Sequence, residues 1–341
     1  MNSTSQELKE KVSTQSSFKN WLWPRFLVFP FLAIAAYPLF ILEVGGDHWA
    51  VQSAWVIFLS YCWFCVSGSL HEAVHHTLFD SESANVWFGR ILGLMIGIPY
   101  TVYKESHRRH HAYLNTSADY ELWPYSDPGT SLAFRRVFVW VDLFFGVFTA
   151  PYIYGRIYYL KDPRLSSQVR RTIFWEYLAQ VPYWMTFLGM VYFLCRRPDG
   201  TFIPFNPIWV LPLIISPMIN TTRKFVEHIG LQSTDPILGT RTILPGNAIS
   251  KLLCYFNFDI AVHGPHHRFP KAQHFELPAR LKEYQTSHPE LKVPIYSSYT
   301  SALISLLPLL WSFPATGNPE DISRQSNDKG DQIPWERTPH S

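Results

Sequence analysis

Apolar and polar stretches alternate along the chain in a way that is typical of membrane proteins. Two apolar stretches, at about residues 26–44 and 49–70, are separated by a short polar turn, and the second is long enough to cross a bilayer as a helix. Two more lie at about residues 177–195 and 203–220, where several prolines favour a short or bent helix. The pattern predicts an all-α integral membrane protein with four transmembrane helices.

Three other apolar stretches are predicted not to cross the membrane. Residues 91–103 are too few for a span. Residues 137–155 contain Asp142, and residues 293–314 contain a proline and several serines. We expect these last two stretches to form helices that lie at the membrane interface.

The ends of the chain are polar, which divides it into three parts. Residues 1–20 are predicted to be a flexible cytosolic N-terminus, residues 21–314 a single membrane domain, and residues 315–341 a disordered tail.

The distribution of basic residues indicates which ends of the predicted spans face the cytosol. The turn after the first span has no Lys or Arg, whereas residues 100–172 have ten. Because basic residues gather on the cytosolic side, the N-terminus, this middle segment and the C-terminal third are predicted to lie there together. Arg196 and Arg197, on the opposite side, run against this trend.

The composition agrees with a membrane protein that also has a substantial aqueous part. Charged residues make up 16%, below the roughly 25% of soluble domains, and the mean hydropathy is near zero. A net charge of +3 is too small to indicate nucleic-acid binding. The cysteines lie in apolar surroundings, so we interpret even the CxxC pair, Cys62 and Cys65, as buried thiols rather than disulfides or zinc ligands.

The histidines carry the candidate chemistry because ten of the fourteen gather in four short motifs. The motifs are HEAVHH (His71, His75, His76), HRRHH (His107, His110, His111), EHIG (His228) and HGPHH (His263, His266, His267). Residues three or four apart share a helix face, so each box is predicted to aim two or three imidazoles at one point. Imidazole is a ligand for iron, zinc, copper and nickel.

Nine of these histidines are more than one metal can use, but they suit two metals with four or five ligands each. His76 lies five residues after His71 and turns away from the shared face, so we expect it to face solvent or to support the ligands. A single histidine such as His228 is more often a hydrogen-bonded core residue, whereas a repeated HxxHH motif argues against chance. Arg108 and Arg109 are expected to point outward, toward lipid headgroups, an acyl carrier or an electron donor.

The predicted topology brings the three boxes to one side of the membrane. The first box directly follows the second span, and two spans separate the second box from the third. The three boxes meet on the cytosolic face provided that residues 137–155 do not cross.

In this order and topology the boxes resemble those of the membrane fatty-acid desaturase superfamily. HRRHHAYLNTSADYE is similar to the family's second box with its trailing Asn115 and Asp119, and HGPHHRFP is similar to its third. RKFVEHIG resembles the extra histidine of many members, and the similarity runs from about residue 49 to residue 312. A departure is Gly264–Pro265, which suggests that the third box is partly a turn.

The resemblance implies a cytosolic, histidine-rich cap that holds two non-haem iron ions and uses O₂ as co-substrate. The implied ligands are His71, His75, His107, His110, His111, His228, His263, His266 and His267. Residues expected to support them are His76, Asn115, Asp119, Glu227 and Asn257.

The implied reaction is oxidation of a fatty acyl chain, with desaturation as the first expectation. Hydroxylation, oxidative decarboxylation to a terminal alkene and carotenoid oxidation remain alternatives. The acyl group can arrive as a free acid, an acyl-CoA, a carrier conjugate or a lipid.

The electrons for this reaction are expected from a separate ferredoxin or cytochrome b5 with its reductase, since the sequence shows no motif for a redox cofactor of its own. Basic residues of the cytosolic face form a candidate docking surface, although positive-inside bias explains them more simply: Arg108, Arg109, Arg135 and Arg136.

Two other classes of function compete with this interpretation. A zinc-dependent membrane hydrolase needs about three histidines and a water, far fewer than nine. A metal or haem carrier is expected to hold its histidines within the spans, whereas these cluster at one end.

Overall fold

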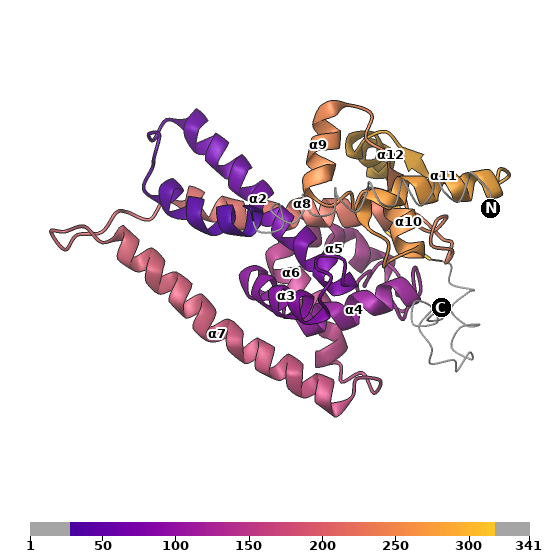
Figure 1. Ribbon diagram of the computed structural model, residues 1–341, viewed down its shortest axis with the longest axis horizontal. Coiled ribbons are helices and arrows are strands. Elements are labelled where there is room, and N and C mark those ends of the chain that lie inside the picture. Colours follow the sequence, from indigo (N-terminus) through magenta and orange to yellow (C-terminus); the bar gives the residue numbers. More distant parts are fainter. Residues whose placement is uncertain (1–27, 318–341) are drawn as a thin grey trace, which may run out of the picture.

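The computed structural model describes residues 28–317, which fold almost entirely into helices (Figure 1). The predicted N-terminal segment 1–20 and residues 318–341 of the predicted tail lie outside the described residues. The strands described are β1 (Thr242–Ile243) and β2 (Ile295–Tyr296), which pair in parallel.

Two helices that pack against each other, α2 (Trp49–His75) and α8 (Leu211–His228), form the centre of the fold. A 3₁₀ turn, η1 (Pro207–Val210), precedes α8, so this helix begins eight residues after the start of the fourth predicted span and ends eight residues beyond it. Helix α2 ends at His75 and α8 ends at His228, so each of the two helices carries a predicted ligand at its C-terminal end.

Two sharp bends keep the middle of the chain from forming straight spans. Helices α3 (Glu82–Ile96) and α4 (Tyr100–Ala112) meet at 99°, and α5 (Leu132–Phe144) and α6 (Gly146–Tyr159) meet at 116°. The first bend follows from Gly97, which has a φ of 74° and ends α3 in the left-handed region that glycine tolerates. Neither residues 91–103 nor 137–155 therefore form one continuous helix.

Helix α7 (Ser167–Cys195) runs along the outer edge of the fold in Figure 1, where it contacts α3 and α4. It begins ten residues before the predicted third span, and its only buried residues are Ile173 and Cys195. Of the residues in its apolar 18-residue stretch, 6% are buried, compared with 61% in the corresponding stretch of α2. A helix that exposes apolar side chains all round requires lipid about it.

The number of membrane crossings is not set by helix length alone. Among the described residues, α2 and α7 are long and apolar enough to cross a membrane, and each bent pair would add a span if it acts as one. The first predicted span is seen as the short helix Val28–Ile41.

The C-terminal third forms a cap of short helices: α9 (Ala248–Phe256), α10 (His263–Arg268), η2 (His274–Glu276), α11 (Leu277–Ser287) and α12 (Tyr299–Ser312). The expectation that Gly264–Pro265 makes the third histidine box partly a turn is wrong. Pro265 lies in the first turn of α10, where its missing N–H costs no hydrogen bond.

Helix α12 lies within the stretch expected at the interface. It buries Ala302, Leu306 and Leu310 while Ile304 and Trp311 stay exposed, so both of its faces are apolar.

The first residues of the predicted tail are part of the fold. Ala315 and Thr316 are buried, and the backbone of residues 315–317 bonds to Gly230, Tyr125 and Leu231.

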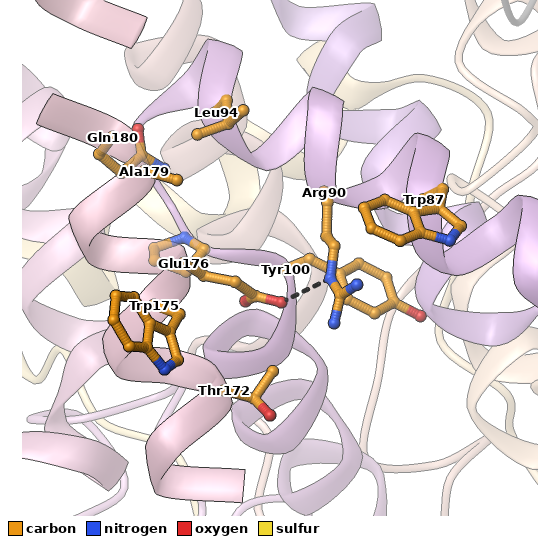
Figure 2. Close-up of a pocket in the computed structure, with 10 residues that line it drawn as sticks. Trp87, Arg90, Leu94, Tyr100, Thr172, Trp175, Glu176, Ala179 and Gln180 are labelled. Carbon is orange, nitrogen blue, oxygen red and sulfur yellow. Dashed lines mark hydrogen bonds and ion pairs between the residues drawn. The ribbon is translucent and has the colours of Figure 1, made fainter. Parts of the chain in front are cut away.

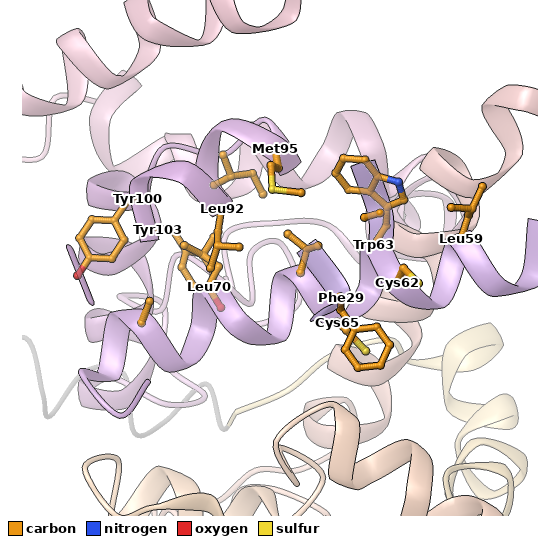
Figure 3. Close-up of a cluster of buried hydrophobic side chains, with 14 of the residues drawn as sticks. Phe29, Leu59, Cys62, Trp63, Cys65, Leu70, Leu92, Met95, Tyr100 and Tyr103 are labelled. Atoms are coloured by element: carbon orange, nitrogen blue, oxygen red, sulfur yellow. The ribbon is translucent and has the colours of Figure 1, made fainter. Parts of the chain in front are cut away.

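The apolar core lies where α2, α3 and α4 meet (Figure 3). Helix α2 contributes Leu59, Trp63 and Leu70 to it, packed against Met95 of α3 and Tyr103 of α4. All four cysteines are buried and none of them forms a disulfide, as expected from their apolar surroundings in the sequence. This core holds the histidine-bearing ends of the helices in fixed positions.

Candidate metal centre

Four helices bring the nine selected histidines together as two buried groups. The first group is His71, His75, His107, His111 and His266, and the second is His110, His228, His263 and His267. Within each group the candidate ligand nitrogens all lie within 4.8 Å of one another. The helices that supply them are α2, α4, α8 and α10.

The second and third boxes each divide their histidines between the two groups. In α4, His107 and His111 join the first group and His110 the second. In α10, the outer pair joins the second group and His266 the first. Each of these boxes thus aims two imidazoles at one point, within the expected two or three, and gives its middle histidine to the other group.

Helix geometry explains the division. A residue at i+4 is rotated by about 40° from residue i, whereas one at i+3 is rotated by about 60° in the opposite sense. Outer histidines of an HxxHH box therefore point together, and the middle one points to a neighbouring site. His71 and His75 are an i, i+4 pair and accordingly stay in one group.

The nitrogens within each group are spaced as ligands of a common ion would be. Nε2 of His107 lies 3.0 Å from that of His75 and 3.1 Å from that of His111. In the second group, Nε2 of His263 lies 2.9 Å from that of His228 and 3.0 Å from that of His267. Two imidazoles bound to one metal at about 2.1 Å and roughly at right angles have their nitrogens about 3 Å apart.

Hydrogen bonding among the histidines alone cannot account for this packing. Nδ1 of His107 faces a carboxylate oxygen of Glu121 at 2.8 Å, so a neutral ring carries its proton there and presents a lone pair at Nε2. That lone pair faces two further imidazole nitrogens. Nε2 of His71 has no hydrogen-bond partner among residues 28–317. A cation in each group would satisfy these atoms, so the residues fit a metal.

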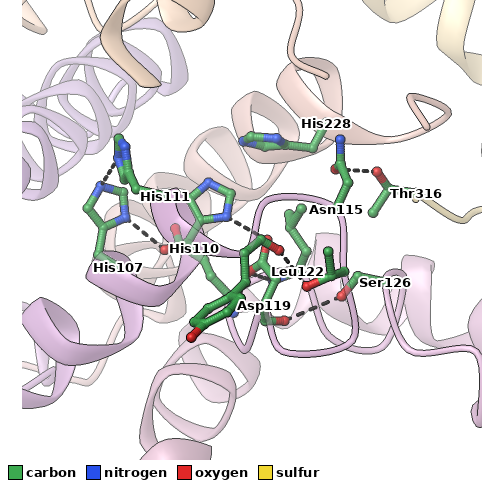
Figure 4. A network of polar contacts seen from close by, with 12 residues as sticks. His107, His110, His111, Asn115, Asp119, Leu122, Ser126, His228 and Thr316 are labelled. Atoms are coloured by element: carbon green, nitrogen blue, oxygen red, sulfur yellow. Dashed lines mark hydrogen bonds and ion pairs between the residues drawn. The ribbon is translucent and has the colours of Figure 1, made fainter. Parts of the chain in front are cut away.

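Two carboxylates in the loop after α4 orient one histidine for each group (Figure 4). Glu121 accepts from His107, and Asp119 accepts from Nδ1 of His110 at 2.8 Å. Asp119 also accepts from the backbone N–H groups of Glu121 and Leu122. Such bonds fix the ring tautomer and orientation and raise ligand basicity. Asp119 was selected from the sequence, whereas Glu121, two residues further on, was missed.

The pKa of Glu121 reflects its neighbours as well as its burial. Burial alone raises the pKa of a carboxyl group, but His107, His110 and the hydroxyl of Tyr154 hold the pKa of Glu121 well below its usual range. The Tyr154 hydroxyl donates to Glu121 at 3.1 Å. Glu121 therefore supports His107 as a carboxylate.

A third buried carboxylate, Glu227, lies against the second group. Glu227 accepts from Arg223 at 3.2 Å and from the hydroxyl of Tyr299 at 3.1 Å, and it lies 3.5 Å from Nε2 of His263. Glu72 has a similar place in the first group, 3.2 Å from Nδ1 of His71. Glu72 and Arg223 were not selected from the sequence, although each adjoins a histidine motif.

The other residues expected to support the ligands do so indirectly or lie apart. Asn115 donates to the backbone carbonyls of Ser233 and Gly239 and accepts from the hydroxyl of Thr316, so it ties loops together (Figure 4). Asn257 lies against Gly68 of α2, where an added Cβ would come within 2.1 Å of its side-chain oxygen. His76 directly follows the last residue of α2 and belongs to neither group.

The expectation that Arg109 points outward is wrong. Its side chain is 6% exposed and pairs with Asp162 at 3.4 Å. Helix α4 packs against both α6 and α7, which covers this side of it. Burial opposes ionisation of Asp162, but Arg164, Arg109 and Tyr120 keep its pKa below the ordinary value. Arg108 is 29% exposed and pairs with Glu105.

The candidate docking surface is also smaller than expected. Arg135 is buried and donates to two backbone carbonyls, so it is not available to a partner. Arg136 donates to the carbonyl of Ser312 in an exposed bond.

Two surface cavities reach the histidines. A cavity of about 490 Å³ is lined by His75 and His107, and one of about 560 Å³ by His111 and His267. Lys271 lines both, so the segment after α10 separates them. Both rims mix basic and acidic side chains.

Comparison with known proteins places this arrangement in context. The family model described as "Fatty acid desaturase" matches residues 47–299, which include all nine histidines. The sphingolipid delta(4)-desaturases of Pongo abelii and Homo sapiens are 28% and 27% identical over 267 residues, covering 73% of this chain and 71% of each relative. The Bos taurus protein of that name is 36% identical over 104 residues, which cover 26% of this chain and 30% of the relative.

Proposed function

Because the chain belongs to the fatty acid desaturase family, we propose that it is a membrane oxidase with two non-haem irons that uses O₂ to introduce a double bond into an acyl chain. Its apolar helices and family make it an integral membrane protein and an oxidoreductase. The observation that carries the proposal is the division of nine buried histidines into a group of five and a group of four.

The ligand count favours iron over zinc. Zinc sites in proteins are almost always four-coordinate, and catalytic ones leave a position for water. A group of five buried imidazoles exceeds that number, and imidazole also suits iron. The count likewise argues against the zinc-dependent hydrolase considered above.

Iron held by these histidines would activate O₂, which is the oxidant that cleavage of an unactivated C–H bond requires. The chain's own residues hold and shield that site. Glu121 and Asp119 keep His107 and His110 in the tautomer that leaves Nε2 free for a metal. The ring of Tyr103 stacks on His107 with centroids 5.3 Å apart, which keeps bulk water from this side.

An apolar cavity beside the histidines suits a hydrocarbon chain. It has a volume of about 200 Å³ and lies among α2, α3, α6, α7 and α8, with Trp63, Met95 and Leu213 in its lining. Ser67 of α2 also lines it, one helical turn before His71. A chain that enters here is held near the first histidine group.

The polar end of the substrate and the electron donor are proposed to approach from the opposite, cytosolic side. The two cavities that reach the histidines open beside Lys104, Lys271 and Arg268, and these basic side chains support that proposal. An external ferredoxin or cytochrome b5 is the proposed donor. The relatives act on sphingolipids by name, which makes a sphingolipid chain the first substrate to test beside free fatty acids.

Expression with a ferredoxin and its reductase, followed by mass spectrometry of lipids and volatile products, tests the reaction. An internal double bond is the expected product. A hydroxylated chain or a terminal alkene would keep the metal site and overturn the proposed outcome.

Metal analysis of the purified protein tests the site separately. We expect two irons per chain, and His75→Ala should lose metal and turnover. His76→Ala is the matched control, because it removes the adjacent imidazole outside both groups. One zinc per chain, or full turnover in His75→Ala, would contradict the proposal.

A further inference from the structure

A second polar site lies between α3, α4 and α7, away from the histidines (Figure 2). It is a cavity of about 400 Å³ lined by Trp87, Arg90, Tyr100, Trp175, Glu176 and Gln180, among others. None of these residues belongs to either histidine group. The site therefore needs an explanation of its own.

The guanidinium of Arg90 is held in place on one side only. Its Nε donates to Glu176 at 2.9 Å, and its carbon lies 4.9 Å from the ring centre of Trp87. Glu176 also accepts from the backbone N–H of Thr101 at 2.7 Å, at the start of α4, and from the Thr101 hydroxyl. The two Nη groups of Arg90 lie on the side away from Glu176 (Figure 2). A fixed guanidinium with donors to spare suits a phosphate group.

Tyr100, at the start of α4, also lines the cavity. The residue is 2% exposed, and its hydroxyl has no hydrogen-bond partner among the described residues. The hydroxyl points away from Glu176 and Trp175 (Figure 2), so the ring of Tyr100 rather than its oxygen meets a ligand in the cavity.

The surroundings place this cavity at the level of lipid headgroups. Arg170 and Arg171 directly precede its first α7 residue, Thr172, and no charged residue occurs from residue 177 to the end of the helix. Trp87 and Trp175 are 65% and 54% exposed at its rim. Exposed tryptophans next to basic residues are typical of the membrane–water interface.

Beyond the cavity, α7 exposes a row of apolar side chains that a lipid acyl chain could lie against. Leu178, Val181, Met185 and Leu188 follow Trp175 at intervals of three or four residues, and each is at least 48% exposed. With so little of α7 covered by protein, its side chains need apolar neighbours from the bilayer.

We propose that this cavity binds a glycerophospholipid, with its phosphate on Arg90 between Trp87 and Trp175 and an acyl chain along α7. The bound lipid fills the space beside α7 and holds that helix against α3 and α4. The proposal is independent of the reaction at the histidines.

Native mass spectrometry of the full chain in mild detergent, titrated with phosphatidylglycerol, tests this proposal. We expect one retained phospholipid per chain and a loss of affinity of about tenfold or more in Arg90→Gln, because a charged hydrogen bond is removed. Arg171→Gln is the matched control, since it removes an exposed arginine from the same end of α7. It should bind as tightly as the native chain.

A second variant keeps the test valid if Arg90→Gln does not fold. Trp175→Ala removes an exposed ring and should also weaken retention. The lipid site is overturned if both variants bind like the native chain, or if Arg171→Gln weakens binding equally. Displacement of the lipid by inorganic phosphate would also overturn it, because the site would then bind free phosphate. A native mass of two chains that falls to one chain in Trp175→Ala would overturn it as well, because the exposed rings would then contact a second copy.

Discussion

Helices α4 and α10 carry the same HxxHH motif but use it in opposite ways. The outer histidines of α4 belong to the group of five and those of α10 to the group of four, and each helix gives its middle histidine to the other group. The two helices thus exchange one ligand. Both groups consequently depend on the relative position of α4 and α10, so neither can form on one helix alone.

The two helices also hold their histidines by different means. In α4, carboxylates fix His107 and His110 at 2.8 Å each. In α10, Nδ1 of His263 and of His267 have no hydrogen-bond partner within residues 28–317. Helix α10 is instead held through its backbone: the Gly264 N–H donates to Oγ1 of buried Thr242 at 3.1 Å, and a Cβ on Gly264 would lie 3.0 Å from that oxygen. Carboxylates orient the rings of the α4 box, whereas the α10 box is positioned by a backbone hydrogen bond and close contact at Gly264.

The largest expected effects come from the exchanged ligands. We predict that His110→Ala and His266→Ala each lose one metal and lower turnover by more than about 100-fold, beyond the 10–100-fold typical of residues that only support a ligand. Double variants identify the group. Adding His228→Ala to His110→Ala should cost no further metal, whereas adding His75→Ala should remove the second one. Metal analysis of the purified variants measures this, and equal losses in both double variants would show that the groups are not separate.

The supporting carboxylates should have the next largest effect. Glu121→Gln and Asp119→Asn keep the shape of the side chain but remove the charge that orients His107 and His110. We expect each to reduce metal affinity or turnover by about 10–100-fold. Glu105→Gln, which affects a partly exposed pair with Arg108, is the control and should be near neutral. Chelator competition is the measurement, and no change in Glu121→Gln would mean that packing alone orients α4.

Packing of α10 can be tested with a single methyl group. Gly264→Ala should reduce the free energy of unfolding by about 1–3 kcal/mol, because buried Thr242 has little room to move. Gly189→Ala in α7 adds the same methyl group where nothing lies within 4 Å, and should be neutral or slightly stabilising. Thermal unfolding compares the two. If Gly264→Ala is as stable as the native chain, α10 is not positioned by this contact.

The smallest expected effect concerns the hydroxyl of Tyr154. Tyr154→Phe removes one hydrogen bond to Glu121 and leaves the ring in place. We expect a cost of about 0.5–1.5 kcal/mol, seen as a several-fold drop in metal affinity by the same chelator assay. An effect as large as that of Glu121→Gln would assign Tyr154 a more direct part in the site.

Several features could be predicted from the sequence because they depend on local pattern. The apolar runs indicated α2 and α7, whereas the interfacial placement expected of residues 137–155 from Asp142 stays a prediction. Asp142 is fully buried there and binds Lys224 at 2.8 Å and the Thr149 hydroxyl. The histidine spacing indicated a multi-ligand site, since i, i+4 pairs share a face in any helix.

Other features depend on contacts between distant segments and could not be predicted in this way. Arg109 looked like a surface residue because Asp162, its partner, lies 53 positions away. Glu121 reaches His107 only because the loop after α4 folds back along the helix.

The sequence by itself determined which nine imidazoles were available and that a membrane lay beside them, because residue type, spacing and hydropathy are local properties. The tertiary structure decided how those imidazoles are divided. It packs α4 against α6 and α7 and sets α10 over β1, so that the middle histidine of each box meets the outer pair of the other. A helical period fixes the angle between side chains on one helix, whereas the distance between two helices depends on everything packed around them.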